Sequence, residues 1–103
     1  MEAQRRLAGL GRVLRAVEAF ARSLAIDLAP IRVNTIAPGF IDTPLIDELA
    51  GELKKAFVEQ ESSRLPVKRI GTPEDIADAV LFLMKNGFVT GITLTVDGGR
   101  MLI

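Results

Sequence analysis

The sequence predicts an α/β fold in which two parallel strands are covered by helices. Two short runs rich in β-branched residues, 31–37 and 92–96, are separated by a long stretch with helical patterns. A strand, a helical crossover and a second strand form a parallel pair. Two strands alone leave both outer edges unpaired, so the predicted sheet is incomplete as a domain.

The composition limits the chain to one domain and excludes several kinds of chemistry. Its 103 residues carry 13 basic and 13 acidic side chains, so no net charge favours binding to nucleic acid or to an anionic membrane. The sequence has no Cys, His, Tyr or Trp. We therefore expect no disulfide, no metal site, no thiol nucleophile and no phenolic proton donor. No apolar run is long enough to span a bilayer, and we expect no membrane partner. The Arg-rich N-terminus is similar to a mitochondrial transit peptide, but Glu2, two glycines and the lack of Ser in it argue against one, so we expect a cytoplasmic protein.

Residues 13–29 repeat apolar side chains with the period of a helix. The predicted buried stripe consists of Val13, Val17, Phe20, Leu24 and Leu28, and it is widened by Leu14, Ala21 and Ala25. Pro30 ends this helix, and Pro38-Gly39 ends the strand 31–37 that follows.

Two further helical regions lie between the predicted strands. The first has Thr43 as its N-cap and Pro44 as its first residue, and it is expected to be irregular around Gly51. The second begins at Thr72-Pro73-Glu74-Asp75 and runs to about Lys85. It is expected to bury Ile76, Val80, Leu81, Leu83 and Met84.

Two stretches, AVEAFARSLAIDLAPIRVNTIAPGFIDTP and RLPVKRIGTPEDIADAVLFLMKNGFVTGITLTVDGG, closely resemble the C-terminal part of the short-chain dehydrogenases/reductases. The segments RVNTIAPG, GTPEDIA and TVDGG are weak signals singly and a strong one in this order and spacing. The resemblance implies the last part of a doubly wound, Rossmann-like parallel sheet and a parent family that uses NAD or NADP. Residues 16–103 would be this segment, and residues 1–15 an extension outside the family pattern.

The resemblance places four cofactor-binding residues after the first strand. They are Pro38, Gly39, Ile41 and Thr43, of which the last two would lie near the nicotinamide carboxamide. The helices from Pro44 to about Ser62 resemble a mobile substrate lid. The alternative is purely structural: Pro38-Gly39 is a turn that ends a strand, and Thr43 is an N-cap.

The resemblance implies no catalytic residue in this chain. The family's Tyr, and the Lys four residues after it, fall on Leu10 and Leu14, and neither leucine can transfer a proton or hold a ribose. Gly9-Leu10-Gly11 lacks the third glycine of a phosphate-binding turn, so a helix interruption or a disordered start explains it better. We expect this chain alone to bind neither NAD nor NADP.

Two functions follow as hypotheses. The chain is a truncated NAD(P)-dependent oxidoreductase that acts on alcohols or carbonyls in its complete form, resembles 3-oxoacyl carrier-protein reductases, and is inactive alone. The abrupt loss of the family pattern between Arg15 and Ala16 suggests a frameshift or a misassigned start. Alternatively, the chain is a non-catalytic module that forms homo-oligomers or docks to an intact family member. Helix 16–29, helix 73–85 and strand 92–96 would supply its interfaces, and leucines of the N-terminus would extend the first helix.

Overall fold

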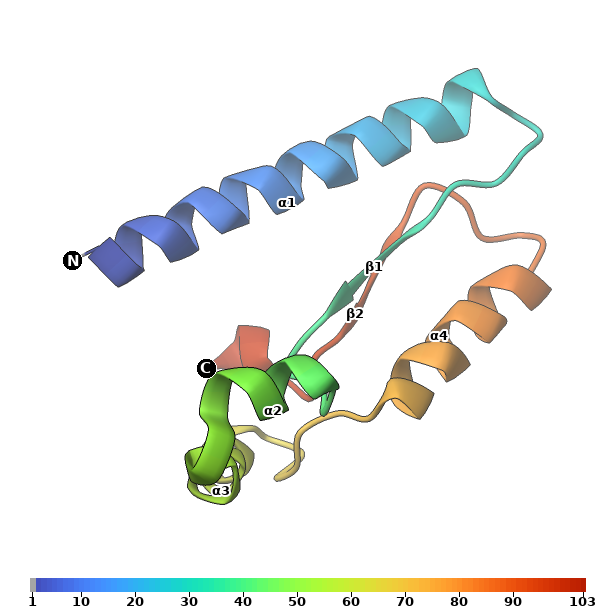
Figure 1. Ribbon diagram of the computed structural model, residues 1–103. Helices are drawn as coiled ribbons and strands as arrows, with labels where there is room; N and C mark the ends of the chain where they lie inside the picture. Colours follow the sequence, from blue (N-terminus) through green and yellow to red (C-terminus); the bar gives the residue numbers. More distant parts are fainter. Residues whose placement is uncertain (1) are drawn as a thin grey trace. The chain divides into compact units, whose positions relative to one another are not determined.

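The computed structural model contains four α-helices, two short 3₁₀ helices (Gly51–Leu53 and Arg100–Leu102) and two strands in the described chain (Figure 1). In chain order the α-helices and strands are α1 (Glu2–Asp27), β1 (Thr35–Pro38), α2 (Pro44–Ala50), α3 (Lys54–Arg64), α4 (Pro73–Lys85) and β2 (Thr93–Val96). The structure describes the backbone of residues 2–103, and the side chains of residues 2–8, 10, 49 and 50 lie outside the described part. The chain divides into two compact units, Met1–Thr35 with Asn86–Thr93 and Ile36–Lys85 with Leu94–Ile103.

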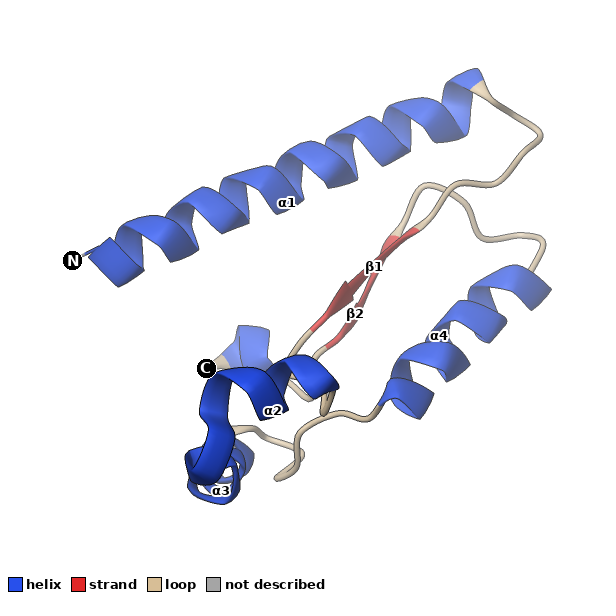
Figure 2. Ribbon diagram, in the orientation of Figure 1, coloured by secondary structure: helices blue, strands red, loops and turns tan. Residues whose placement is uncertain are grey.

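The two strands form a parallel pair, as the sequence predicts (Figure 2). The amide of Thr35 donates to the carbonyl of Ile92 at 2.9 Å, and the amide of Gly39 donates to that of Val96 at 3.0 Å. From the first of these hydrogen bonds to the second, the residue numbers rise in both strands, so the strands are parallel. The α/β fold class is therefore confirmed.

The first strand is shorter than the predicted 31–37, because its first residues pair irregularly: the amide of Gly91 donates to the carbonyl of Val33 at 2.8 Å, and side chains make the other contacts. The amide of Val33 donates to the hydroxyl of Thr90 at 3.1 Å. The side chain of Asn34 donates to the carbonyl of Val89 at 3.0 Å and accepts from the amide of Ile92 at 3.2 Å. Regular strand pairing begins only after these contacts.

Helix α1 runs without interruption from Glu2 to Asp27, so the break expected at Gly9-Leu10-Gly11 is wrong. The expectation that the N-terminus extends the first helix is confirmed, and this says nothing of an interface. A Cβ at Gly9 or Gly11 would meet nothing within 4 Å, so no close packing requires these glycines. Each costs the helix about 1 kcal/mol relative to alanine, without breaking it.

The apolar stripe of α1 is less buried than its period predicts. Ala21, Leu24 and Ala25 are half-buried, whereas Val17 and Phe20 are exposed. The stripe therefore presents a largely uncovered apolar face in the described chain.

Helix α4 starts and ends where the sequence predicts, but it buries fewer residues. Leu83 is buried and Ile76 is half-buried, whereas Val80, Leu81 and Met84 are exposed. The prediction that all five are core is wrong, because Leu81 and Met84 project away from Leu83, and Val80, although it lies between Ile76 and Leu83, is not fully covered by the rest of the described chain. Ile76 and Leu83 are seven residues apart and project to the same side, whereas Leu81 projects well away from it.

The hydrophobic core of the second unit lies at α2 and α3. It consists of Ile46, Leu65 and Ile70, against which Phe40, Phe57 and Val58 pack. Leu65 is only 1% exposed. The irregularity predicted at Gly51 is confirmed, since this residue ends α2 with φ +52°, a conformation that favours glycine. This core fixes the loop that follows β1.

Candidate functional site

The candidate site is built around residues 39–43, the loop between β1 and α2. This loop pairs with the segment before α4, because the amide of Gly71 donates to the carbonyl of Phe40 at 2.8 Å. The amide of Asp42 donates in turn to the carbonyl of Gly71 at 2.9 Å, and Ile41 forms a parallel bridge with Gly71. The backbone of the loop is thus fixed by a partner outside the strand pair.

Gly39 packs tightly against the end of β2. A Cβ built at Gly39 would lie 2.8 Å from both the Cα and the Cβ of Asp97. Real side chains do not approach backbone atoms so closely, so packing within the chain itself requires glycine here. The neighbouring Pro38 is exposed. The structural interpretation of Pro38-Gly39, as a turn that ends a strand, accounts for both residues.

Thr43 occupies the N-cap position of α2 but does not cap it with its side chain. Its backbone is extended, at φ −131° and ψ 165°, and its carbonyl accepts from the amide of Ile46 at 3.0 Å. The predicted position is therefore confirmed, whereas capping alone does not account for the threonine side chain. Thr43 is half-buried, and the helix does not use its hydroxyl for capping.

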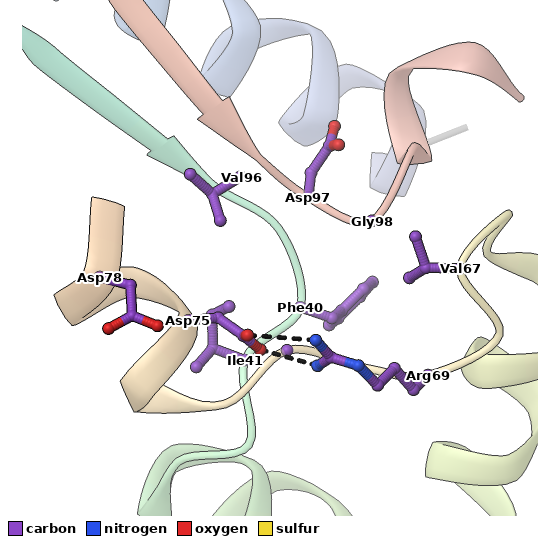
Figure 3. Close-up of a pocket in the computed structure, with 10 residues that line it drawn as sticks. Phe40, Ile41, Val67, Arg69, Asp75, Asp78, Val96, Asp97 and Gly98 are labelled. Carbon is purple, nitrogen blue, oxygen red and sulfur yellow. Dashed lines mark hydrogen bonds and ion pairs between the residues drawn. The ribbon is translucent and has the colours of Figure 1, made fainter. Parts of the chain in front are cut away.

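A cavity of about 250 Å³ lies beside the loop, in the second unit (Figure 3). Of the four predicted cofactor-binding residues, only Ile41 lines it. Pro38, Gly39 and Thr43 do not. The ten lining residues come from the loop, the segment before α4, α4 itself and the end of β2: Phe40, Ile41, Val67, Arg69, Gly71, Asp75, Asp78, Val96, Asp97 and Gly98.

The charges that line the cavity are mainly negative and are largely engaged with the protein itself. Arg69 donates to both carboxylate oxygens of Asp75, at 2.7 and 3.1 Å (Figure 3). This ion pair, with an N–H donated by Thr72, holds the pKa of Asp75 far below its usual range, and Asp75 raises the pKa of Arg69. The carboxylate of Asp97 accepts from the amides of the turn that follows it, at 2.9 and 3.1 Å.

These residues do not fit a whole nicotinamide dinucleotide. Three carboxylates line the cavity, and its single lining cation, Arg69, is already paired with Asp75. A dinucleotide carries two phosphates, which the carboxylates would repel. The cavity is also smaller than the pockets that usually enclose ligands of that size. The loop can thus contribute at most to one end of such a cofactor site.

The positions where the resemblance places the catalytic Tyr and Lys lie on α1. Leu14 is exposed and offers no polar atom, and the side chain of Leu10 lies outside the described residues. Within the described residues, no cluster of three or more side chains suited to metal binding occurs. Nor does any helix in that part of the chain combine the length and hydrophobicity needed to cross a bilayer.

Sequence reasoning missed three residues at this site: Phe40, which is part of the loop, and Glu61 and Arg100, which lie beside it. Glu61 is buried, and it accepts a hydrogen bond from Arg100, which lies 39 residues further along the chain. No local pattern relates residues so far apart. The pair Arg69 and Asp75 could have been found, because the arginine precedes a helix start whose third residue is an acid.

Comparison with known proteins relates the chain to reductases. The chain matches the family model described as enoyl-(acyl carrier protein) reductase over residues 10–100. It is 45% identical over 92 residues to the short-chain reductase protein NovJ of Streptomyces niveus, covering 82% of this chain and 35% of that protein. It is 42% identical over 84 residues to the 3-oxoacyl-[acyl-carrier-protein] reductase FabG of Aquifex aeolicus, covering 78% and 32%.

Among solved structures, the chain is likewise similar to dehydrogenases and reductases. A small-chain dehydrogenase in complex with NADPH is 40% identical and superimposes with a TM-score of 0.81, over 86% of this chain and 41% of that one. The reductase/Diels-Alderase MalC of Malbranchea aurantiaca is 34% identical with a TM-score of 0.81, over 85% and 34%. The chain belongs to the short-chain dehydrogenase/reductase family. It spans about a third of the length of the curated relatives named above.

Proposed function

We propose that this chain is the C-terminal segment of an NAD(P)-dependent short-chain oxidoreductase and that it has no catalytic activity alone. The complete enzyme would transfer hydride between the cofactor and an alcohol or carbonyl. The observation that carries the proposal is the family match over residues 10–100, in which leucines occupy the expected positions of the Tyr and Lys. An aliphatic side chain can neither pass a proton nor stabilise a phenolate.

The loop 39–43 would supply only part of a cofactor site. Ile41 lines the cavity, and the hydroxyl of Thr43 is not used to cap α2, which supports a role for both near a carboxamide. The solved relative in complex with NADPH supports NAD(P) as the cofactor of the parent family. The FabG relatives favour 3-oxoacyl carrier-protein substrates for the complete enzyme.

The test is an assay of the purified chain with NADH and with NADPH, in the presence of a 3-oxoacyl thioester and of a simple ketone. Absorbance of the reduced cofactor reports turnover, and a full-length FabG serves as the positive control. We expect no turnover above the background without enzyme. Reproducible turnover that Thr43→Val abolishes would contradict the proposal, because it would place a working site in this chain.

Exposed apolar side chains on α4 support a second function, the binding of another chain. Ala77, Val80 and Leu81 are exposed at positions i, i+3 and i+4, so they form an apolar stripe along one side of the helix. Leu81 is 51% exposed. Exposed apolar stripes of this kind are typical of interfaces. We propose that this stripe binds a second copy of the chain.

Sedimentation velocity over a range of protein concentrations tests the second proposal. We expect a concentration-dependent dimer that Leu81→Asp abolishes, because the carboxylate would be buried unpaired. Leu53→Asp is the matched control, since Leu53 is also exposed and lies outside α4. A chain that stays monomeric at every concentration overturns the proposal, as does equal loss of the dimer in both variants. If the chain does not associate with itself but binds an intact family member, that protein is the partner of the stripe and a second copy is not.

A further inference from the structure

Glu61, on α3, is the one charged side chain among the described residues that is buried, with 7% of the residue exposed. One carboxylate oxygen accepts a hydrogen bond from Arg100 at 3.0 Å, and the other lies 3.7 Å from the guanidinium of Arg64. A buried carboxylate is costly unless it is paired with good geometry. The contact with Arg100 is the shorter of the two and comes from a distant part of the chain.

Arg100 stands at the start of the 3₁₀ turn Arg100–Leu102, which Asp97, Gly98 and Gly99 connect to β2. This turn is held by Asp97, whose carboxylate accepts from the amides of Gly99 and Met101. The guanidinium of Arg100 is consequently placed on a short, hydrogen-bonded turn rather than on a free end. A fixed turn can direct a side chain with little loss of conformational entropy.

The guanidinium of Arg100 makes a second contact, with Phe40 of the loop 39–43. Its Cζ atom lies 4.8 Å from the centre of the Phe40 ring, which is cation–π distance. The same ring meets Phe57 of α3 edge to face, at 5.6 Å between ring centres and 77° between planes. Arg100 therefore touches both α3, through Glu61, and the loop, through Phe40.

We propose that Arg100 is a positioning residue that fixes α3 against the loop 39–43. Arg100, Glu61 and Phe40 together form what we call the latch. Each of its contacts joins elements that no regular secondary structure connects: the turn after β2, α3, and the loop after β1. The latch lies wholly within the second unit and does not depend on any reaction, so it goes beyond the proposed function.

The two contacts of Arg100 need different properties of its side chain. A lysine in its place retains the positive charge for Glu61, but it lacks the planar guanidinium that stacks on an aromatic ring. A methionine retains much of the aliphatic stem and removes the charge, which leaves Glu61 buried without its nearest cation. The two substitutions thus separate the charge contact from the stacking contact.

Hydrogen–deuterium exchange of the full chain tests the latch. In Arg100→Met we expect the amides of α3 to exchange about tenfold faster, while those of α4 keep their rates. Arg100→Lys should restore part of the protection of α3. Arg64→Met is the matched control, because Arg64 is exposed and lies farther from Glu61, and it should leave α3 unchanged.

The NMR resonances of the Phe40 ring give a second readout, because a general loss of stability would not move them selectively. We expect them to shift in both Arg100 variants and not in Arg64→Met. Equal acceleration of exchange in α3 and α4, or no acceleration in either, overturns the proposal. If Arg100→Met does not fold, Arg100→Lys decides: shifted Phe40 resonances with faster exchange confined to α3 support the latch, and unshifted resonances overturn it.

Discussion

Gly39 lies so close to the end of β2 that even one additional carbon has no space. The nearest atoms belong to Asp97 and include its Cα, so a new methyl group would push against backbone rather than against a side chain that can rotate. Strain of this kind cannot be relieved locally. The glycine is accordingly a requirement of the strand pair, whether or not a ligand also approaches it.

At the scale of the residue, Gly39→Ala should destabilise the chain by about 1–3 kcal/mol through overpacking. Urea unfolding followed by circular dichroism measures the change in the free energy of unfolding. Gly87→Ala is the matched control, because a Cβ at Gly87 would meet nothing within 4 Å. It should change stability by no more than about 0.5 kcal/mol. Equal effects of the two substitutions would show that the close approach to Asp97 is not limiting.

At the scale of the element, the start of α4 is stabilised by reciprocal hydrogen bonds. The amide of Thr72 donates to the carboxylate of Asp75 at 2.8 Å, and the amide of Asp75 donates to the Thr72 hydroxyl at 3.2 Å. This is a capping box with Asp in the place usually held by Glu or Gln. Arg69 adds an ion pair to the same carboxylate, so one side chain both caps the helix and anchors the segment before it.

The lowered pKa of Asp75 predicts how stability depends on pH. Since its folded pKa lies below its ordinary value of about 3.9, the ionised carboxylate stabilises the folded chain at neutral pH. That stability begins to decrease as the pH falls below about 4 and is lost completely only when the pH passes the lowered pKa of the folded state. Asp75→Asn should lower the melting temperature near neutral pH, and its difference from the unsubstituted chain should shrink as the pH approaches about 3.

Thermal unfolding followed by circular dichroism at several pH values checks this expectation. Asp78→Asn is the control, because Asp78 lies on the same helix and is exposed. It removes the same charge without removing the cap or the pair with Arg69. A difference between Asp75→Asn and the unsubstituted chain that stayed constant over the whole pH range would contradict the assignment.

The boundaries of the helices could be predicted from the sequence better than the burial of their side chains could. Thr72-Pro73 and Gly51 mark boundaries through local backbone chemistry, and the structure has those boundaries. Burial was not predictable in the same way, because an apolar period shows which side of a helix avoids water and not what covers it. Val80 and Phe20 were expected to be core for this reason, yet both are exposed.

The candidate site was predictable in part. The loop 39–43 was located by its motif, and Ile41 does line the cavity. The tight approach of Gly39 to Asp97 and the contact between Glu61 and Arg100 depend on tertiary structure. Residues that meet only after the chain folds leave no spacing in the sequence that could reveal them.

At the scale of the whole molecule, the exposed apolar face of α1 can show whether another polypeptide covers the chain. Phe20 is 65% exposed, so Phe20→Ala should change the free energy of unfolding of the chain by no more than about 0.5 kcal/mol. If another polypeptide covered this face, the same substitution would cost about 3–5 kcal/mol. Urea unfolding of the purified chain measures the difference. Leu65→Ala is the control, since Leu65 is buried and should cost about 2–5 kcal/mol in either case.

The parallel strand pair also has a consequence for the order of folding. Its residues are far apart in the chain, since the contacts of Val33 and Asn34 with the segment before β2 span 57 and 55 residues. Helices α1 and α4 can form from neighbouring residues, whereas the strands must first close a long loop at an entropic cost. Pairing of β1 with β2 should therefore be a late and slow event. Until it occurs, both strands are open to any other chain that offers an edge.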